Sequence, residues 1–145
     1  MSLIGNYDPE NIFAKILKGD MPCVKLYEDK YVLAFMDVFP QSHGHCLVIP
    51  KTEARNLLDV PPDNLTPLIV QTQRLAKAVK SALKPDGIRI MQFNGALAGQ
   101  TVFHLHFHII PIYKEDDMKS HTSGKMTDMD ALEKIATKIR SEILI

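Results

Sequence analysis

The longest patterned stretch of the chain runs from Leu65 to Leu83, where apolar residues recur every three or four positions. This is the period of one face of an α-helix, so the stretch predicts a single long amphipathic helix. Pro85-Asp86-Gly87 ends it, because proline breaks the helical hydrogen bonding and glycine favours the turn that follows. Its first residue is less well defined, since prolines stand at positions 61, 62 and 67.

Two shorter helices are predicted near the ends of the chain. Asp8 as N-cap, a proline at the next position and apolar residues at helical spacing predict a helix that ends at Gly19. A second helix with one apolar face is predicted over residues 127–143, opened by Thr127 with an acidic residue three positions later. We also expect a short helical turn at residues 53–58.

Five stretches rich in strand-forming residues are separated by these helices and by polar turns. They cover residues 24–27, 31–36, 45–49, 88–93 and 103–110. Because the helices fall between hairpins rather than after every strand, we predict an α+β fold: a five-stranded, mainly antiparallel sheet with a long central helix and a C-terminal helix. One domain is expected over residues 1–145, with its core at 10–112 and a polar connector at 113–125.

Composition restricts the class of partner. The chain has 145 residues, of which 46% are hydrophobic, and its 17 basic residues balance 17 acidic ones. There is thus no charge excess to hold a nucleic acid polymer or an anionic membrane. Cys23 and Cys46 show no paired spacing, no signal peptide opens the chain, and no apolar stretch approaches the ~18 residues that span a bilayer. We expect a soluble protein of the reducing cytoplasm that binds a small ligand.

Three histidines alternate with apolar residues in the last predicted strand. In a strand, successive side chains point to opposite faces, so His104, His106 and His108 share one face. The alternating apolar side chains, from Phe103 to Ile109, face the core. Half of the six histidines of the chain are therefore placed on one surface, which indicates a chemical rather than a structural role.

Two kinds of chemistry fit this pattern. A metal site needs three or four ligands that converge on one point, but residues two apart in a strand lie about 6.6 Å apart. Alternatively, a neutral imidazole attacks phosphorus and forms a phosphoramidate that water later hydrolyses. With an ordinary pKa near 6.5, most of a histidine is neutral at pH 7. Residues 94–101, a glycine-bearing loop directly before the histidines, can supply amide, backbone N–H and hydroxyl donors to phosphate oxygens.

The run around the histidines carries a family resemblance. It reads Gly99-Gln100-Thr101-Val102-Phe103-His104-Leu105-His106-Phe107-His108-Ile109-Ile110. This resembles the signature of the histidine-triad (HIT) family of nucleotide hydrolases and transferases. Residues 33–37, 43–51 and 11–19 are similar to further blocks of that family, so the resemblance covers about residues 10–112 in order.

The resemblance implies a role for each matching position. His106 falls on the nucleophile, His108 beside the α-phosphate, and His104 on the residue that orients the nucleophile through its main chain. His45 falls on a fourth histidine close to the triad, and Asp37 on the carboxylate that binds the ribose. The phosphate-side positions are Asn94, Gln100 and Thr101, and the base pocket, whose members are equally ordinary core residues, is Ile12, Phe13, Phe35, Val38 and Leu47.

One departure from the family bears on metal binding. Many bacterial relatives resemble a zinc-bound pattern with four ligands, and in this chain those places hold Asn11, Ala14, Glu53 and His104. Since only the histidine is a strong zinc ligand, we expect no structural zinc, no metal at the triad and no cofactor.

The leading hypothesis is an enzyme that hydrolyses a purine nucleoside phosphoramidate, or a related nucleotidyl compound, through a covalent nucleotidyl-His106 intermediate. Hydrolysis of dinucleoside polyphosphates differs only in the leaving group and stays open. A non-catalytic nucleotide-binding regulator is an alternative of another class, and a metal-dependent hydrolase is a third. The resemblance also implies a homodimer in which the long helix and an adjacent strand meet the partner.

Overall fold

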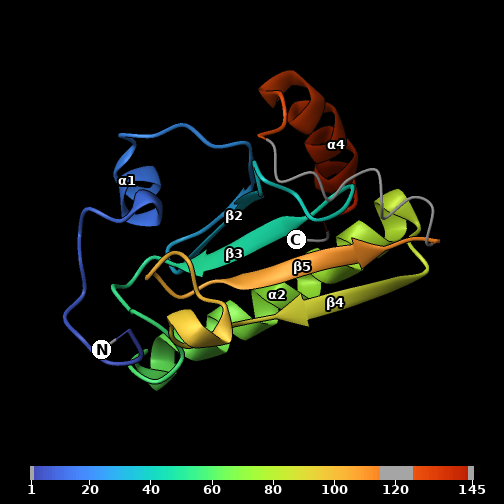
Figure 1. Ribbon diagram of the computed structural model, residues 1–145. Coiled ribbons are helices and arrows are strands. Elements are labelled where there is room, and N and C mark those ends of the chain that lie inside the picture. Colours follow the sequence, from blue (N-terminus) through green and yellow to red (C-terminus); the bar gives the residue numbers. More distant parts are fainter. Residues whose placement is uncertain (1, 115–125, 144–145) are drawn as a thin grey trace.

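A single antiparallel sheet organises the molecule (Figure 1). The computed structural model describes residues 2–114 and 126–143. The sheet has five strands in the order β1-β2-β3-β5-β4, and every neighbouring pair is antiparallel. The strands are β1 (Lys25–Glu28), β2 (Val32–Met36), β3 (Cys46–Pro50), β4 (Gly87–Met91) and β5 (Phe107–Ile112). The predicted α+β class is confirmed.

Helices cover the two faces of the sheet unequally. The long helix α2 (Pro62–Leu83) crosses the back of the sheet in Figure 1, and α4 (Met129–Ser141) packs beside it and against β1. The short helix α1 (Ile12–Lys18) contributes Phe13 to a smaller cluster on the opposite face. The predicted connector 113–125 lies outside the described residues, apart from its first two positions.

Strict alternation in β2 and β3 explains how both faces are buried. In β2, Val32, Ala34 and Met36 belong to the main core under α2 and α4, whereas Leu33 and Phe35 belong to the smaller cluster with Phe13. All five residues of each of these strands are buried. The smaller cluster is the floor on which the site described below is built.

Several predicted boundaries were wrong. Strand β5 begins at Phe107 rather than at residue 103, and residues 101–106 form bends and extended chain instead. Phe103 does not enter the core, because its ring lies 4.3 Å from the guanidinium of Arg55 in a cation–π contact. Residues 53–58 form turns without a helix.

Capping explains where the helices begin and end. Asn11, not Asp8, caps α1, accepting a hydrogen bond from the backbone N–H of Ala14 at 2.9 Å. Asp128, not Thr127, is the N-cap residue of α4. The long helix begins directly after Pro61 and contains Pro67 within its first two turns. None of the helices in the described ranges is long and apolar enough to cross a membrane.

Candidate active site

A cavity of about 480 Å³ opens on the α1 side of the sheet. Its floor is made by Phe35 and Leu47 from the sheet, and α1 closes one side with Ile12 and Phe13. His106, directly before β5, and His108, within β5, reach the cavity from the sheet. Apolar walls with a few convergent polar groups are typical of a small-molecule site.

The ring of His106 is held in one tautomer. Its Nδ1 lies 2.7 Å from the carbonyl oxygen of His104, and because a carbonyl only accepts, Nδ1 carries the proton. The edge of Phe13 packs against the same ring, with centroids 4.9 Å apart. Burial lowers the pKa of His106 below its ordinary value, partly opposed by the bond to the carbonyl. Its Nε2 is therefore an unprotonated lone pair at the wall of the cavity.

His104 faces away from the cavity and is completely buried. Its Nε2 donates to the carbonyl oxygen of Pro50 at 2.8 Å, and its Nδ1 accepts from the hydroxyl of Tyr7 at 2.5 Å. Both nitrogens are thus occupied, and burial lowers the pKa of this ring to about 4. These two hydrogen bonds hold His104 in place, and with it the backbone carbonyl that orients His106.

His108 is oriented by a second chain of hydrogen bonds. The backbone N–H of Gln41 donates to Nδ1 of His45 at 3.0 Å, so the proton of His45 lies on Nε2. That Nε2 lies 2.9 Å from Nδ1 of His108 and donates to it. The remaining N–H of His108, at Nε2, is free to serve a ligand. Burial lowers the pKa of His45 to about 3 and that of His108 to about 4, so both rings are neutral at pH 7.

Asp37 follows β2 and lines the same cavity. Its Oδ1 accepts from the backbone N–H of Phe39 at 2.8 Å, and its Oδ2 lies 3.4 Å from Nε2 of His45. Burial raises the pKa of Asp37 to about 6, against the lowering effect of the Phe39 N–H. The carboxylate is thus charged at pH 7 and able to accept hydroxyl protons.

Three donor groups in the described part of the chain could hold a metal ion. Atoms of Asp37, His45 and His108 lie within 4.8 Å of one another. His45 and His108 already share a proton across 2.9 Å, so a cation here would have to displace it. The four positions of the zinc-like pattern are poorer metal ligands: Asn11 caps α1, Ala14 is buried in it, Glu53 is exposed, and both nitrogens of His104 are occupied.

In the loop of residues 94–101, one predicted site residue lines the cavity and two make hydrogen bonds within the surrounding structure instead. Thr101 lines the cavity. The amide of Gln100 instead ties the loop together, accepting from Gly95 N–H and donating to the carbonyls of Arg55 and Val102. The side-chain Oδ1 of Asn94 accepts from the backbone N–H of Leu57 at 2.9 Å. In this structure neither Gln100 nor Asn94 reaches the cavity, because these local bonds direct both side chains elsewhere.

All five residues predicted for the base pocket line the cavity: Ile12, Phe13, Phe35, Val38 and Leu47. Sequence reasoning missed others, namely Tyr7 behind His104 and, in the cavity wall, Phe39, Cys23, Met126 and Met129. Met129 is the first residue of α4 and Met126 precedes it; both lie more than 80 positions away in sequence from Val38 and Phe39, which line the same cavity. A local sequence pattern cannot predict such a contact between distant segments.

The chain is similar in sequence and in fold to known proteins of one family. The HIT domain model matches residues 18–115. The adenosine 5'-monophosphoramidase HNT1 of Saccharomyces cerevisiae is 38% identical over 146 residues, covering 99% of this chain and 89% of that protein. Adenylylsulfatase HINT3 of Arabidopsis thaliana is 40% identical over 105 residues, covering 72% of this chain and 53% of that protein. A crystal structure of a Hit-like protein from Bartonella henselae, described as involved in cell-cycle regulation and bound to an unknown ligand, superposes with a TM-score of 0.89 at 48% identity, covering 95% and 99% of the two chains.

Proposed function

The chain belongs to the HIT family of nucleotide hydrolases, and from that premise we propose that it hydrolyses purine nucleoside phosphoramidates through a covalent nucleotidyl-His106 intermediate. One observation carries the proposal: the carbonyl of His104 holds the proton of His106 on Nδ1, 2.7 Å away, and leaves Nε2 as a lone pair facing the cavity. A neutral, oriented imidazole is the form of histidine that attacks phosphorus.

The reaction divides into two displacements at the α-phosphorus. In the first, the Nε2 lone pair of His106 forms a P–N bond while the P–N bond of the substrate breaks, and the leaving nitrogen takes up a proton to depart as an amine. In the second, water adds to phosphorus, the bond to His106 breaks, and the water proton is released. The products are a nucleoside monophosphate and the amine, and His106 returns to its neutral form.

The remaining polar groups suit the two ends of the nucleotide. The Nε2–H of His108, freed by the bond that its Nδ1 accepts, is a donor for the phosphoryl oxygens or the departing group. Asp37 would accept the ribose hydroxyls, and the apolar wall that includes Phe35 and Leu47 would enclose the base. Thr101, exposed at the cavity mouth, would add a hydroxyl on the phosphate side.

The leaving group is the open part of the proposal. Similar proteins are named for adenosine 5'-monophosphoramidate and for adenylyl sulfate, which share the adenylyl group and differ in what departs. A dinucleoside polyphosphate fits the same attack, with a nucleotide as the leaving group. A regulator that binds nucleotide without turnover would use the same contacts.

A substrate panel tests the proposal. The protein is incubated with adenosine 5'-phosphoramidate, adenylyl sulfate and diadenosine tetraphosphate, and release of AMP is followed with and without a chelator. We expect fastest turnover of the phosphoramidate, no effect of the chelator, and loss of turnover in His106→Ala with AMP binding retained. Turnover that is lost with the chelator would instead support the metal site at Asp37, and binding without any turnover would support the regulator.

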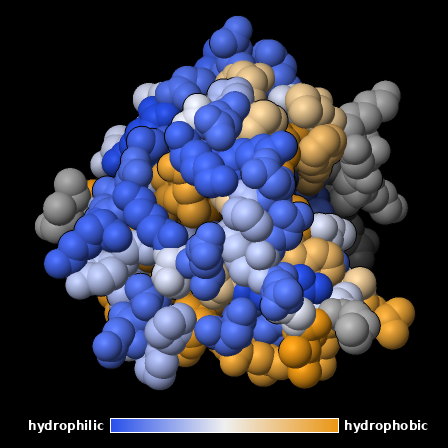
Figure 2. All heavy atoms as spheres, turned by 90° about the vertical axis from the view of Figure 1, so that its left-hand side faces the viewer, coloured by the Kyte–Doolittle hydropathy of each residue, from blue (hydrophilic) through white to orange (hydrophobic). Residues whose placement is uncertain are grey.

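We further propose a homodimer in the reducing cytoplasm. β4 is an edge strand, and its Ile90 is 46% exposed, as is Ile69 on α2. Apolar side chains also gather along the lower edge of the molecule in Figure 2. Leu58 and Leu97 are further exposed apolar side chains. Both cysteines are free thiols. Sedimentation equilibrium of the protein and of Ile69→Asp tests the dimer; a monomer in both samples would contradict it.

A further inference from the structure

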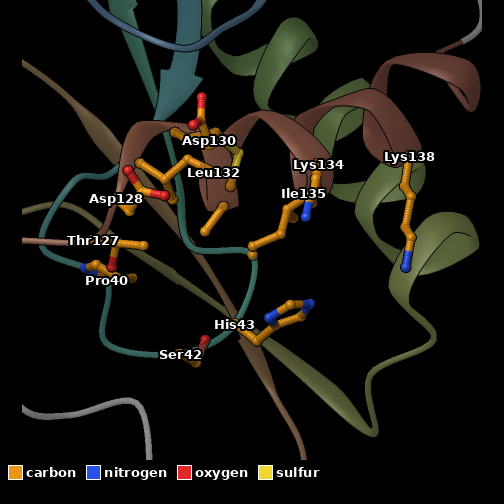
Figure 3. Close-up of a pocket in the computed structure, with 13 residues that line it drawn as sticks. Pro40, Ser42, His43, Thr127, Asp128, Asp130, Leu132, Lys134, Ile135 and Lys138 are labelled. Carbon is orange, nitrogen blue, oxygen red and sulfur yellow. The ribbon is translucent and has the colours of Figure 1, made fainter.

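A second cavity, of about 440 Å³, lies on the other side of the loop that carries Asp37. It is a groove between the first three turns of α4 and residues 40–44 (Figure 3). Met36, Leu132 and Ile135 form an apolar floor, and polar groups stand around the rim. The volume is in the range of small-molecule sites. Nothing in the reaction proposed above uses it.

An unsatisfied hydroxyl points to a ligand here. Ser42 is completely buried and lines the groove, and its Oγ is the one buried side-chain polar atom without a hydrogen-bond partner within the part of the chain that the structure describes. Figure 3 shows this oxygen directed from the loop toward the groove. A buried hydroxyl without a partner is costly, so such a group calls for an explanation. A ligand atom that accepts from Ser42 would satisfy it.

The charges along the groove select the type of ligand. Lys134 and Lys138, one turn apart on α4, extend toward the side where His43 and Ser42 lie (Figure 3). Neither lysine is in an ion pair among residues 2–114 and 126–143. Asp128 and Asp130 lie at the opposite end of the groove, about 15 and 12 Å from Lys138 along the helix axis, although Asp130 is only about 6 Å from Lys134. An anionic group therefore suits the lysine end, while the acidic end disfavours a polyanion such as a nucleoside triphosphate.

The two cavities share a wall. Of the loop after β2, Asp37 and Phe39 line the first cavity, whereas Pro40 and Ser42 line the second. At the start of α4 the pattern repeats, with Met126 and Met129 on one side and neighbouring residues 127, 128 and 130 on the other. A ligand in the groove thus contacts the segments that shape the first cavity.

From these observations we propose that the groove between α4 and residues 40–44 binds a compact organic anion, a single carboxylate or phosphate on a small apolar body. Its charged group lies between Lys134 and Lys138 and accepts a hydrogen bond from Ser42. Its apolar body rests on Leu132 and Ile135. Carboxylate and phosphate share this chemistry, and the test below separates them.

The test is residue-resolved NMR titration of the full chain. Benzoate and phenyl phosphate are titrated separately, each with and without saturating AMP, and benzyl alcohol is the uncharged control. We expect benzoate, phenyl phosphate or both to shift the amide signals of residues 42–43 and 131–138, with AMP present or absent, and benzyl alcohol to bind at least tenfold more weakly. Smaller shifts should appear at Phe39 and Met129. Shifts confined to residues 101–108, or none with either anion, would overturn the proposal, whatever AMP does.

Two variants separate binding from folding. Ser42→Ala removes the hydroxyl without enlarging the side chain, and we expect an unchanged or higher Tm together with about tenfold weaker anion binding, the effect of losing one hydrogen bond to a charged group. Lys134→Gln/Lys138→Gln should weaken binding further. The matched control Lys30→Gln/Lys84→Gln removes two exposed lysine charges outside both cavities. Equal affinity in all four proteins would refute the site.

Discussion

The hydroxyl of Tyr7 holds the ring of His104, whose backbone carbonyl orients His106. Removing that hydroxyl measures how far the orientation of His106 depends on it. In Tyr7→Phe the Nδ1 of His104, in a ring that is completely buried, loses its hydrogen-bond donor. An unsatisfied buried acceptor costs about 1–3 kcal/mol, so the free energy of unfolding should fall by that amount. The bond from His104 Nε2 to Pro50 remains, and the fold should survive.

The same change should slow catalysis without weakening substrate binding. If about 1 kcal/mol of that loss appears as misorientation of the His104 carbonyl, kcat should fall roughly fivefold, because about 1.4 kcal/mol corresponds to a factor of ten. KM should stay within about twofold, since Tyr7 does not line the cavity.

The assay pairs urea unfolding with steady-state release of AMP from adenosine 5'-phosphoramidate. Tyr31→Phe is the matched control, because Tyr31 is 39% exposed and lies outside the cavity. The reasoning is refuted if Tyr7→Phe and Tyr31→Phe are equally stable and equally active. A rise in KM with normal kcat would also contradict it, because it would place Tyr7 at the substrate.

Three further predictions follow from the described geometry. Asp37→Asn should raise KM for the ribonucleotide substrate about tenfold or more, and much less for its 2',3'-dideoxy analogue, as steady-state kinetics with both substrates would show; equal effects would contradict ribose binding. The buried triad histidines and His45 have pKa values below the ordinary value, so the folded state binds fewer protons than the unfolded state as pH falls from about 6.5 toward 4; the free energy of unfolding by urea should decrease over that range, and Asp37, whose pKa is raised to about 6, should only partly oppose the decrease. Gly44→Ala should destabilise the protein by about 1–3 kcal/mol, because φ is +93° and the new Cβ displaces Cδ1 of Leu83, the flexible end of that side chain, whereas Gly19→Ala, at φ +84° with open space around it, should cost about 1–2 kcal/mol; a higher Tm for Gly44→Ala than for Gly19→Ala would refute the steric argument.

The parts of the fold that follow short-range periodicity were predictable from sequence. The helix over residues 62–83 and the alternation in β2 arise from contacts repeated every few residues, which the printed sequence displays directly. Its first turn could not be located, because prolines are equally compatible with a loop and with the start of a helix. The late start of β5 has a tertiary cause: Phe103 packs against Arg55, and the backbone N–H of Leu105 bonds to Ala54, rather than to a neighbouring strand.

In the candidate site, too, sequence periodicity predicts some features, and others depend on contacts between residues distant in sequence. Leu105 and Phe107 lie in the main core and His106 and His108 line the cavity, as alternation predicts, but burial itself does not alternate, because His104 and His106 are buried as well. The first two histidines also precede the strand. What sequence could not supply is the direction of each ring. His104 turns to Tyr7 and Pro50 and away from the cavity, and these partners are distant in sequence. Asn94 and Gln100 are likewise directed by backbone groups of residues 55–57, which no local pattern connects to their loop.

The most direct test of the central claim is the mass of the reaction intermediate. The protein is mixed with adenosine 5'-phosphoramidate, quenched within a single turnover under alkaline conditions that preserve phosphohistidine, and measured by intact and peptide mass spectrometry beside His106→Ala. One adenylyl group per chain is expected, located on His106 and missing from the variant. Turnover of the phosphoramidate with no adduct, or an adduct that persists in His106→Ala, would contradict it.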